Sequence, residues 1–291
     1  MKDYKIQIAL TSLCLFGALM VVAQQRIEIE STAILYKQVD TTQLYLHMYR
    51  PLDFDDQKTY KAIMFIHGGG WNQGDHKAFK RQCMYFASRG MITFSIDYRV
   101  KDVHGTTPFD ATQDAYHAYQ YLLKHARKLS IDKKNIVVGG GSAGGHLATT
   151  TAFWGKSKER PAALLLFNPV LDTGPEGFGY QRMEGRHEEI SPIDNIGENQ
   201  PPTIIMVGTN DKVLPVPTAK RYKSLMEEAG QVCRLVLYEG QEHAFFARKP
   251  IKFFIDTTDQ CDQFLQELGL IEGESTITEQ YGEYEVEVRI L

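Results

Sequence analysis

The fold of this 291-residue chain is decided by residues 135–145, NIVVGGGSAGG. Residues 135–139 form a short apolar run, which is typical of a strand buried on both faces of a parallel sheet. The pattern Gly-x-Ser-x-Gly around Ser142 follows at once, and a helical stretch over 143–153 comes next. A strand, a tight turn and a helix in this order hold a serine with its hydroxyl exposed. A phosphate-binding turn is disfavoured, because no lysine follows the serine.

Apolar runs and helical patterns also occur before and after residues 135–145. Further apolar runs occur at residues 61–66, 91–97, 162–168, 203–208 and 233–238. Helical patterns lie between and after them, at residues 77–89, 110–129, 216–229 and 252–268. Two runs near the start, 27–36 and 43–49, alternate with period two and are expected to form an antiparallel edge. Buried strands that alternate with helices predict an α/β fold, with a mostly parallel, doubly wound sheet of about eight strands and helices on both faces.

The two ends of the chain differ from this central pattern. Residues 1–23 combine a basic start with the uncharged run 8–22 and a small residue at Ala23, which is the pattern of a secretory signal peptide. A membrane-spanning helix needs about 20 apolar residues, so an uncleaved anchor is the less favoured interpretation. We therefore expect an exported protein, periplasmic or secreted, with one α/β domain over residues 24–271. Residues 272–291 form an acidic tail whose alternating end is compatible with a late edge strand.

Composition excludes several functional classes. The chain is 43% hydrophobic, with 32 Lys and Arg against 36 Asp and Glu and a net charge of −4. This balance excludes global disorder and lacks the basic surface that nucleic-acid binding requires. Three cysteines remain after signal-peptide cleavage, and it is left open whether Cys233 and Cys261 form a disulfide. We expect no metal, no cofactor, no nucleic-acid partner and no membrane association after cleavage, and the oligomeric state is undetermined.

A second glycine-rich motif, His67-Gly68-Gly69-Gly70-Trp71, directly follows the buried run 61–66. Negative charge develops on a carbonyl oxygen during acyl transfer, and backbone N–H groups aimed at that oxygen stabilise it. Successive glycines let the backbone turn these groups into a site without hindrance from side chains. We therefore predict that the N–H groups of Gly69, Gly70 and Ala143 form an oxyanion hole.

A nucleophilic serine needs a general base, and the base needs an orienting acid. Asp211 and His243 each follow a buried run, so they lie at the strand ends where α/β sheets place their sites. We predict a catalytic triad of Ser142, Asp211 and His243, with Asp172 and Asp194 as alternative acids. Six other histidines lack this context, and we expect surface or packing roles for them: His47, His76, His104, His117, His125 and His187.

Taken together, these motifs resemble the α/β-hydrolase superfamily and, within it, the hormone-sensitive-lipase-like esterases. The matching segments are His67–Trp71, Ser95–Arg99, Gly140–Gly145, the loop of Asp211 and His243–Phe246. Within this branch the chain is similar to exported bacterial carbohydrate esterases, which remove acetyl or feruloyl groups from plant polysaccharides. The resemblance implies an α/β-hydrolase catalytic domain over residues 24–271. It also implies a serine carboxylic ester hydrolase that forms an acyl-enzyme intermediate on an acylated carbohydrate or another small ester.

One departure from the branch concerns the substrate. Many of its members carry a large N-terminal helical cap, whereas the residues between position 23 and His67 are few and largely strand-like. An open cleft suits a bulky polymer or oligosaccharide better than a buried lipid chain. Aromatic faces suit sugar rings and phenolic acyl groups, so we predict substrate contacts by aromatic side chains at Trp71, Tyr98, Tyr180 and Phe246. The irregular segment 172–202 is a candidate lid.

Proteins with this fold also serve two other functions. The same triad and fold serve amide and peptide hydrolases, including arylformamidases. Peptidases of this kind usually carry an accessory propeller domain, and an arylformamidase is more naturally cytosolic. A catalytically silent binding protein is disfavoured, because nucleophile, base, acid and oxyanion glycines are all present in the sequence.

Overall fold

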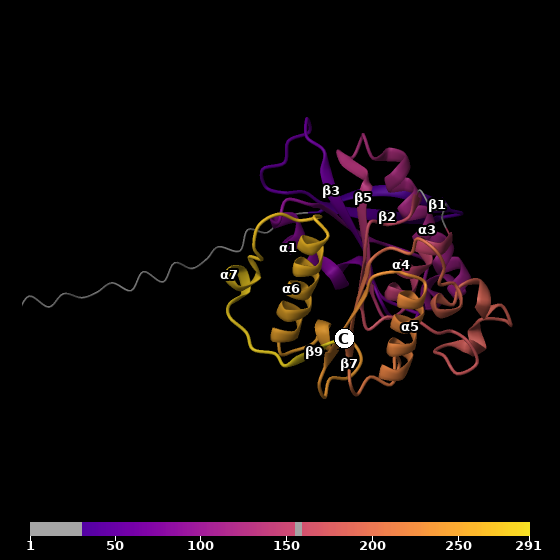
Figure 1. Ribbon diagram of the computed structural model, residues 1–291. Helices are drawn as coiled ribbons and strands as arrows, with labels where there is room; N and C mark the ends of the chain where they lie inside the picture. Colours follow the sequence, from indigo (N-terminus) through magenta and orange to yellow (C-terminus); the bar gives the residue numbers. More distant parts are fainter. Residues whose placement is uncertain (1–30, 155–158) are drawn as a thin grey trace, which may run out of the picture.

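The computed structural model describes residues 31–154 and 159–291 of the chain. In these residues nine strands form one sheet, in the order β1-β2-β4-β3-β5-β6-β7-β8-β9 (Figure 1). Their bounds are Thr32–Val39 (β1), Thr42–Tyr49 (β2), Tyr60–Ile66 (β3), Ile92–Ile96 (β4), Ile131–Gly141 (β5), Leu164–Phe167 (β6), Thr203–Gly208 (β7), Cys233–Tyr238 (β8) and Val288–Ile290 (β9). The signal peptide predicted over residues 1–23 lies outside the described residues.

The sheet is parallel in its centre and antiparallel at both edges. Neighbouring strands from β4 to β8 pair in parallel, as the buried apolar runs predict. The two alternating runs near the start form β1 and β2, which are antiparallel to each other, and β2 is antiparallel to β4. At the opposite edge the tail contributes β9, antiparallel to β8. The predicted doubly wound α/β sheet is confirmed, with one strand more than expected.

Seven α-helices lie in the described part of the chain. They are Lys80–Ser88 (α1), Lys101–His104 (α2), Pro108–His125 (α3), Ala143–Trp154 (α4), Val216–Glu228 (α5), Lys252–Glu267 (α6) and Ile277–Tyr281 (α7). The short helices α2 and α7 were not predicted. Helix α3 begins two residues before the predicted start, because Thr107 and Asp110 form a capping box and Pro108 occupies the first turn. No helix in the described ranges is long and apolar enough to cross a membrane.

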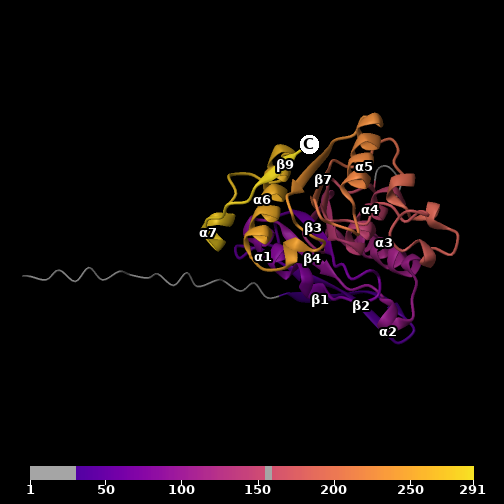
Figure 2. The same cartoon turned by 90° about the horizontal axis from the view of Figure 1, so that it is seen from below.

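Helices cover both faces of the sheet, and each face has its own hydrophobic core. Figures 1 and 2 show α3, α4 and α5 on one side of the sheet and α1 and α6 on the other. Along β3 the side chains alternate between the two cores: Met64 packs into the first, and Ile63 and Phe65 pack into the second. This alternation explains the continuous apolar run in the sequence, since both faces of the strand are buried.

The structure also shows whether Cys233 and Cys261 form a disulfide. Cys233 at the start of β8 and Cys261 in α6 are both buried free thiols, so the disulfide left open in the sequence is not formed. Burial raises the pKa of the Cys233 thiol to about 12, so it is protonated at neutral pH. Buried protonated thiols of this kind act as small apolar side chains.

Candidate active site

Ser142 occupies the turn between β5 and α4. Its φ of 54° lies in the left-handed region, where a non-glycine residue is strained by about 1–2 kcal/mol. A Cβ on Gly140 would lie 2.3 Å from the carbonyl oxygen of Gly144, and a Cβ on Gly144 would lie 2.1 Å from that of Ile66. Both positions therefore require glycine. The N–H of Ser142 donates to the carbonyl of Phe167 at 3.0 Å, which holds the turn against β6.

The structure brings Ser142, His243 and Asp211 into one hydrogen-bonded chain. Nε2 of His243 lies 2.8 Å from Oγ of Ser142, and its Nδ1 lies 2.8 Å from Oδ2 of Asp211. Oδ1 of Asp211 accepts the N–H groups of Val213 and Leu214 at 2.8 and 2.9 Å. The Asp211 side chain is fully buried. This arrangement supplies a nucleophile, a general base and an orienting acid, and the three follow along the chain in the order Ser142, Asp211, His243.

The two alternative acids do not take part in this chain. Oδ1 of Asp172 accepts the N–H of Gly174 at 2.8 Å. Asp194 ends the short 3-10 helix η5 (Pro192–Asp194), and its own N–H donates to the carbonyl of Ser191. The partner of His243 is therefore Asp211.

The glycine loop after β3 lies beside Ser142. Gly69 and Gly70 have φ of 111° and 62°, so both use conformations that glycine adopts readily. The carbonyl of Gly69 accepts the N–H groups of Asn72 and Gln73 at 3.0 and 3.3 Å, and this turn holds the loop. Within residues 31–154 and 159–291, no loop hydrogen bond between backbone groups uses the N–H of Gly69, Gly70 or Ala143.

A cavity of about 640 Å³ opens over Ser142 at the carboxyl ends of the strands. Backbone of the glycine loop and the side chains of Ser142 and His243 form its polar part. Apolar side chains form much of the remaining wall: Phe79, Phe178, Val213 and Phe246. The cavity can therefore receive an apolar acyl group beside the nucleophile and the glycine N–H groups.

Of the four aromatic residues predicted to contact substrate, Phe246 lines this cavity. The structure does not place the other three in the cavity lining. Trp71 is fully buried, with its ring 5.1 Å edge-on to that of His146. Tyr98 is buried, and its hydroxyl donates to the carbonyl of His67 at 3.1 Å. Tyr180 lies in the 3-10 helix η3 (Tyr180–Arg182), against His187 and away from the cavity wall.

The burial of Trp71 and Tyr98 has one physical reason. The glycine loop has few side chains of its own, so neighbouring aromatic rings must supply the packing that holds it. Tyr98 stacks on His67 with ring centroids 4.2 Å apart, and the Arg182 guanidinium lies 5.4 Å from the centroid of Trp71 while donating to the carbonyl of Gly70. Trp71 and Tyr98 therefore support the loop from behind.

Sequence reasoning missed two residues of the site. Phe178 lines the cavity from the segment 172–202. Asn168 follows β6 with φ of 38°, lines the cavity and places Nδ2 3.4 Å from Nε2 of His243. A polar residue at the carboxyl end of a buried apolar run was the available signal for Asn168, because Asp211 and His243 were found in the same way.

Two buried histidines near the site are unsuited to act as its base. Burial lowers the pKa of His67, although a hydrogen bond with the carbonyl of Gly68 opposes this effect. Burial lowers the pKa of His146 to about 3. Both imidazoles are therefore neutral at pH 7, and His243 is the histidine hydrogen-bonded to Ser142.

Comparisons with known proteins agree with this geometry. The BD-FAE family matches residues 46–178. The acetylxylan esterase of Xylanibacter ruminicola is 25% identical over 226 residues, which are 72% of this chain and 44% of that protein. The ethyl acetate hydrolase of Pseudomonas putida is 25% identical over 230 residues, which are 69% of this chain and 71% of that protein. The chain thus spans less than half of the first relative and about two thirds of the second.

A solved structure gives a higher identity. Esterase 2 of Thermogutta terrifontis, phosphoramylated by tabun, is 36% identical with a TM-score of 0.79 and covers 84% of this chain and 97% of that one. Its propionate-bound form is 34% identical with a TM-score of 0.78, covering 86% and 98% of the two chains. The chain therefore belongs to the hormone-sensitive-lipase-like esterases of the α/β-hydrolase superfamily, which are carboxylic ester hydrolases.

Proposed function

We propose that this protein is a serine esterase that removes short acyl groups through an acyl-enzyme intermediate. The observation that carries the proposal is the chain from Ser142 through His243 to Asp211, with both heavy-atom distances at 2.8 Å. A base within hydrogen-bond distance of the nucleophile, and an acid on its other nitrogen, is the arrangement that activates a serine.

In the first half-reaction, Oγ of Ser142 attacks the ester carbonyl carbon while Nε2 of His243 takes the hydroxyl proton. The oxyanion that forms is stabilised by the N–H groups of Gly69, Gly70 and Ala143, each worth about 3–4 kcal/mol in well-aligned sites. The carbon–oxygen bond to the alcohol then breaks, and His243 returns the proton to the leaving oxygen. Asp211 holds the imidazole in the required tautomer and stabilises the imidazolium.

In the second half-reaction, water takes the place of the alcohol. His243 removes a proton from the water, whose oxygen attacks the acyl carbon. The bond from that carbon to Oγ of Ser142 breaks, Ser142 regains its proton, and the carboxylic acid leaves. No other reactant is needed, because the acyl group simply passes from the alcohol to Ser142 and then to water.

The acyl group is proposed to be short. Phe246 packs against the serine turn so closely that a Cβ on Gly141 would lie 2.8 Å from its Cζ. Phe79 stacks on the same ring with its centroid 5.8 Å away, and Phe167 packs against it at a tilt with its centroid 4.9 Å away. A wall of packed rings next to the nucleophile restricts the length of a flexible alkyl chain, whereas the flat ring of a feruloyl group can lie along the aromatic faces. The ethyl acetate hydrolase and the propionate-bound esterase among the relatives support this choice.

The alcohol is proposed to be a carbohydrate, with an acetyl or feruloyl group on a plant polysaccharide or oligosaccharide as the natural substrate. The similarity to an acetylxylan esterase supports this, together with the aromatic wall of Phe178 and Phe246 in the cavity. Aromatic rings pack on both sugar faces and phenolic acyl groups. Export to the periplasm or medium, proposed from residues 1–23, would bring the enzyme to such a substrate.

An ester panel tests these proposals. Protein starting at residue 24 is assayed with 4-nitrophenyl acetate, butyrate and octanoate, methyl ferulate, acetylated xylan and a 4-nitroanilide. We expect the acetate ester to be hydrolysed faster than the octanoate, acetylated xylan to release acetate, and the anilide to be turned over more slowly than the esters. Octanoate as the best ester would refute a short acyl site. Faster cleavage of the anilide would assign an amide hydrolase instead.

The variant Ser142→Ala tests whether Ser142 is the nucleophile. Ser142→Ala should lose about 10⁴-fold or more in kcat with acetate ester while keeping the wild-type melting temperature. Ser88→Ala, at the end of α1 and remote from the cavity, is the matched control and should retain full activity. Activity retained by Ser142→Ala would show that the hydrolysis uses another nucleophile.

A further inference from the structure

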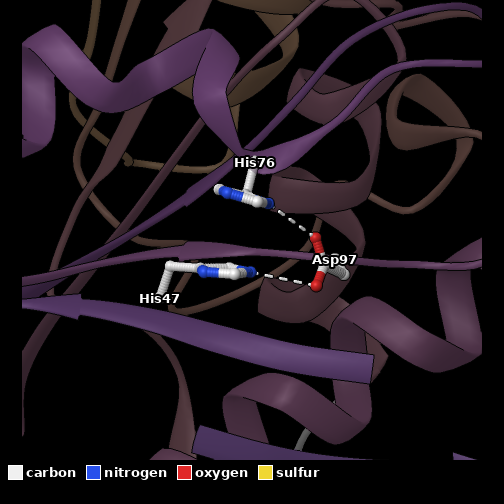
Figure 3. A group of neighbouring side chains, drawn as sticks. All are labelled: His47, His76 and Asp97. Atoms are coloured by element: carbon white, nitrogen blue, oxygen red, sulfur yellow. Dashed lines mark hydrogen bonds and ion pairs between the residues drawn. The ribbon is translucent and has the colours of Figure 1, made fainter. Parts of the chain in front are cut away.

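A second group of side chains lies outside the cavity, at the side of the glycine loop. His47 comes from β2, His76 begins the 3-10 helix η1 (His76–Phe79), and Asp97 follows β4. Figure 3 shows both imidazoles directed at one carboxylate. Nε2 of His47 lies 3.0 Å from Oδ2 of Asp97, and Nδ1 of His76 lies 3.0 Å from Oδ1. The two rings are stacked, with centroids 3.4 Å apart and planes at 14°.

We propose that His47, His76 and Asp97 bind one divalent transition-metal ion of the zinc class. Two imidazole nitrogens and one carboxylate are donors that Zn²⁺ and its neighbours in the periodic table prefer. One ligand atom from each residue lies within 4.8 Å of the other two. Water would complete the coordination, as it does in zinc sites with three protein ligands.

Two distances, one from each imidazole nitrogen to an oxygen of Asp97, fit a shared ion. Ligand atoms about 2.0–2.2 Å from an ion, at tetrahedral or octahedral angles, lie about 3.0–3.5 Å from one another. Each imidazole nitrogen lies 3.0 Å from an oxygen of Asp97, which is within that range. The ion would replace the protons that now bridge the nitrogens and the carboxylate, and each imidazole would carry its proton on the other nitrogen.

The surroundings hold the backbone and leave the side chains room to adjust. The N–H of Asp97 donates to the carbonyl of Tyr45, the hydroxyl of Tyr36 donates to the carbonyl of Asp97, and Oγ of Ser95 donates to the carbonyl of His76. Because the rings are nearly parallel, an ion in the plane of both requires each to tilt. Side-chain exposures of 13% (His47), 22% (His76) and 27% (Asp97) allow this rotation and give the ion access from solvent.

An ion at this position would tie three elements together. His76 lies between Gly74 and Ala78, which line the active-site cavity, whereas His47 lies in β2 and Asp97 directly follows the neighbouring strand β4. The proposed ion therefore acts as a structural link between the sheet and the segment that continues from the glycine loop. The sequence predicts surface or packing roles for these histidines and no metal, because residues 21 to 50 positions apart form no recognisable ligand motif.

Two near-isosteric variants test the site. His47→Gln places an amide nitrogen close to the position of Nε2, and His76→Asn places one close to that of Nδ1. Both keep an N–H donor for Asp97 and remove the imidazole ligand, so the hydrogen bonds to the carboxylate persist. After treatment with a chelator, calorimetric titration with ZnCl₂ should show one ion per wild-type chain. Each variant should weaken this binding at least about tenfold.

Two control variants test whether Zn²⁺ binds at other histidines instead. His243→Ala removes the triad imidazole, and His125→Asn removes one at the end of α3, and both should bind Zn²⁺ as the wild type does. Visible absorption of bound Co²⁺ should report nitrogen ligation in the wild type and change in His47→Gln and His76→Asn. Circular dichroism of the metal-free variants checks their folding. The proposal is overturned if wild-type protein binds no Zn²⁺, or if both variants bind it as tightly as the wild type.

Discussion

Oδ1 of Asn168 accepts a hydrogen bond from the N–H of Ala244 at 3.2 Å, directly after the histidine of the triad. Asn168 is fully buried and adopts a left-handed φ of 38°, and Ala244 has φ of 62°. A side chain at the end of β6 therefore anchors the turn that follows β8, two strands away in the sheet. The same amide places Nδ2 3.4 Å from Nε2 of His243.

Replacing Asn168 tests this positioning role. Asn168→Ala leaves the N–H of Ala244 without its partner and frees the turn that holds His243. We expect kcat for 4-nitrophenyl acetate to fall about tenfold, equivalent to about 1.4 kcal/mol, with KM nearly unchanged. Steady-state kinetics measure kcat and KM separately, and thermal melting monitors stability. A rise in KM without loss of kcat would instead assign Asn168 to substrate binding.

Asp211→Asn should damage catalysis through the tautomer of His243. Oδ1 of the new side chain can still accept from Val213 and Leu214, so its amide NH₂ must face Nδ1 of His243. Nδ1 then becomes an acceptor and Nε2 carries the proton, which prevents it from taking the proton of Ser142. We expect kcat to fall about 10³–10⁴-fold with little change in melting temperature. Activity within tenfold of wild type would argue against Asp211 as the orienting acid.

The sequence predicts the central sheet well because its information is local. The apolar run of β5 predicts a buried strand, and the glycines around Ser142 predict a tight turn. Asp211 and His243 each follow a strand that the apolar pattern identifies. The prediction that Trp71 contacts substrate rests on the chemistry of its aromatic ring, which does not determine where the side chain points, and the structure buries this ring in the core. The position of Asn168 at the end of an apolar run is visible in the sequence, but its approach to His243, across 75 residues, depends on the assembled sheet.

The glycine loop offers a matched pair of substitutions. A Cβ on Gly69 would lie 2.0 Å from the carbonyl oxygen of Gln73, so Gly69→Ala must displace the turn that aims the N–H groups. A Cβ on Gly70 would have its nearest neighbour, Nδ2 of Asn72, at 3.7 Å, so Gly70→Ala meets only the strain of a positive φ.

We expect Gly69→Ala to lose about 10²-fold or more in kcat, and Gly70→Ala to lose about tenfold or less. Kinetics with 4-nitrophenyl acetate, run beside thermal melts, distinguish lost catalysis from lost folding. Equal losses in the two variants would show that steric fit of the loop backbone does not control the site.

A final prediction concerns the pH dependence of stability. Burial, with a contribution from nearby Asp259, raises the pKa of Asp256 to about 6, although a hydrogen bond from the hydroxyl of Tyr238 opposes the shift. The native state therefore holds this proton at pH values where the unfolded chain has released it. The contribution of Asp256 to stability is fully present below about pH 4 and is lost as pH rises through about 6.

Asp256→Asn keeps an oxygen that accepts from Tyr238 and removes the ionisation. We expect it to stabilise the protein at pH 8, by up to about 3 kcal/mol, and to have little effect at pH 4.5. Asp262→Asn on the same helix is the contrasting control. It breaks an ion pair with Arg89 at 2.8 Å and should destabilise the fold at pH 8 by about 3 kcal/mol or more. Urea unfolding at the two pH values measures both effects, and a stabilisation by Asp256→Asn that is equal at pH 4.5 and pH 8 would exclude ionisation of Asp256 as its cause.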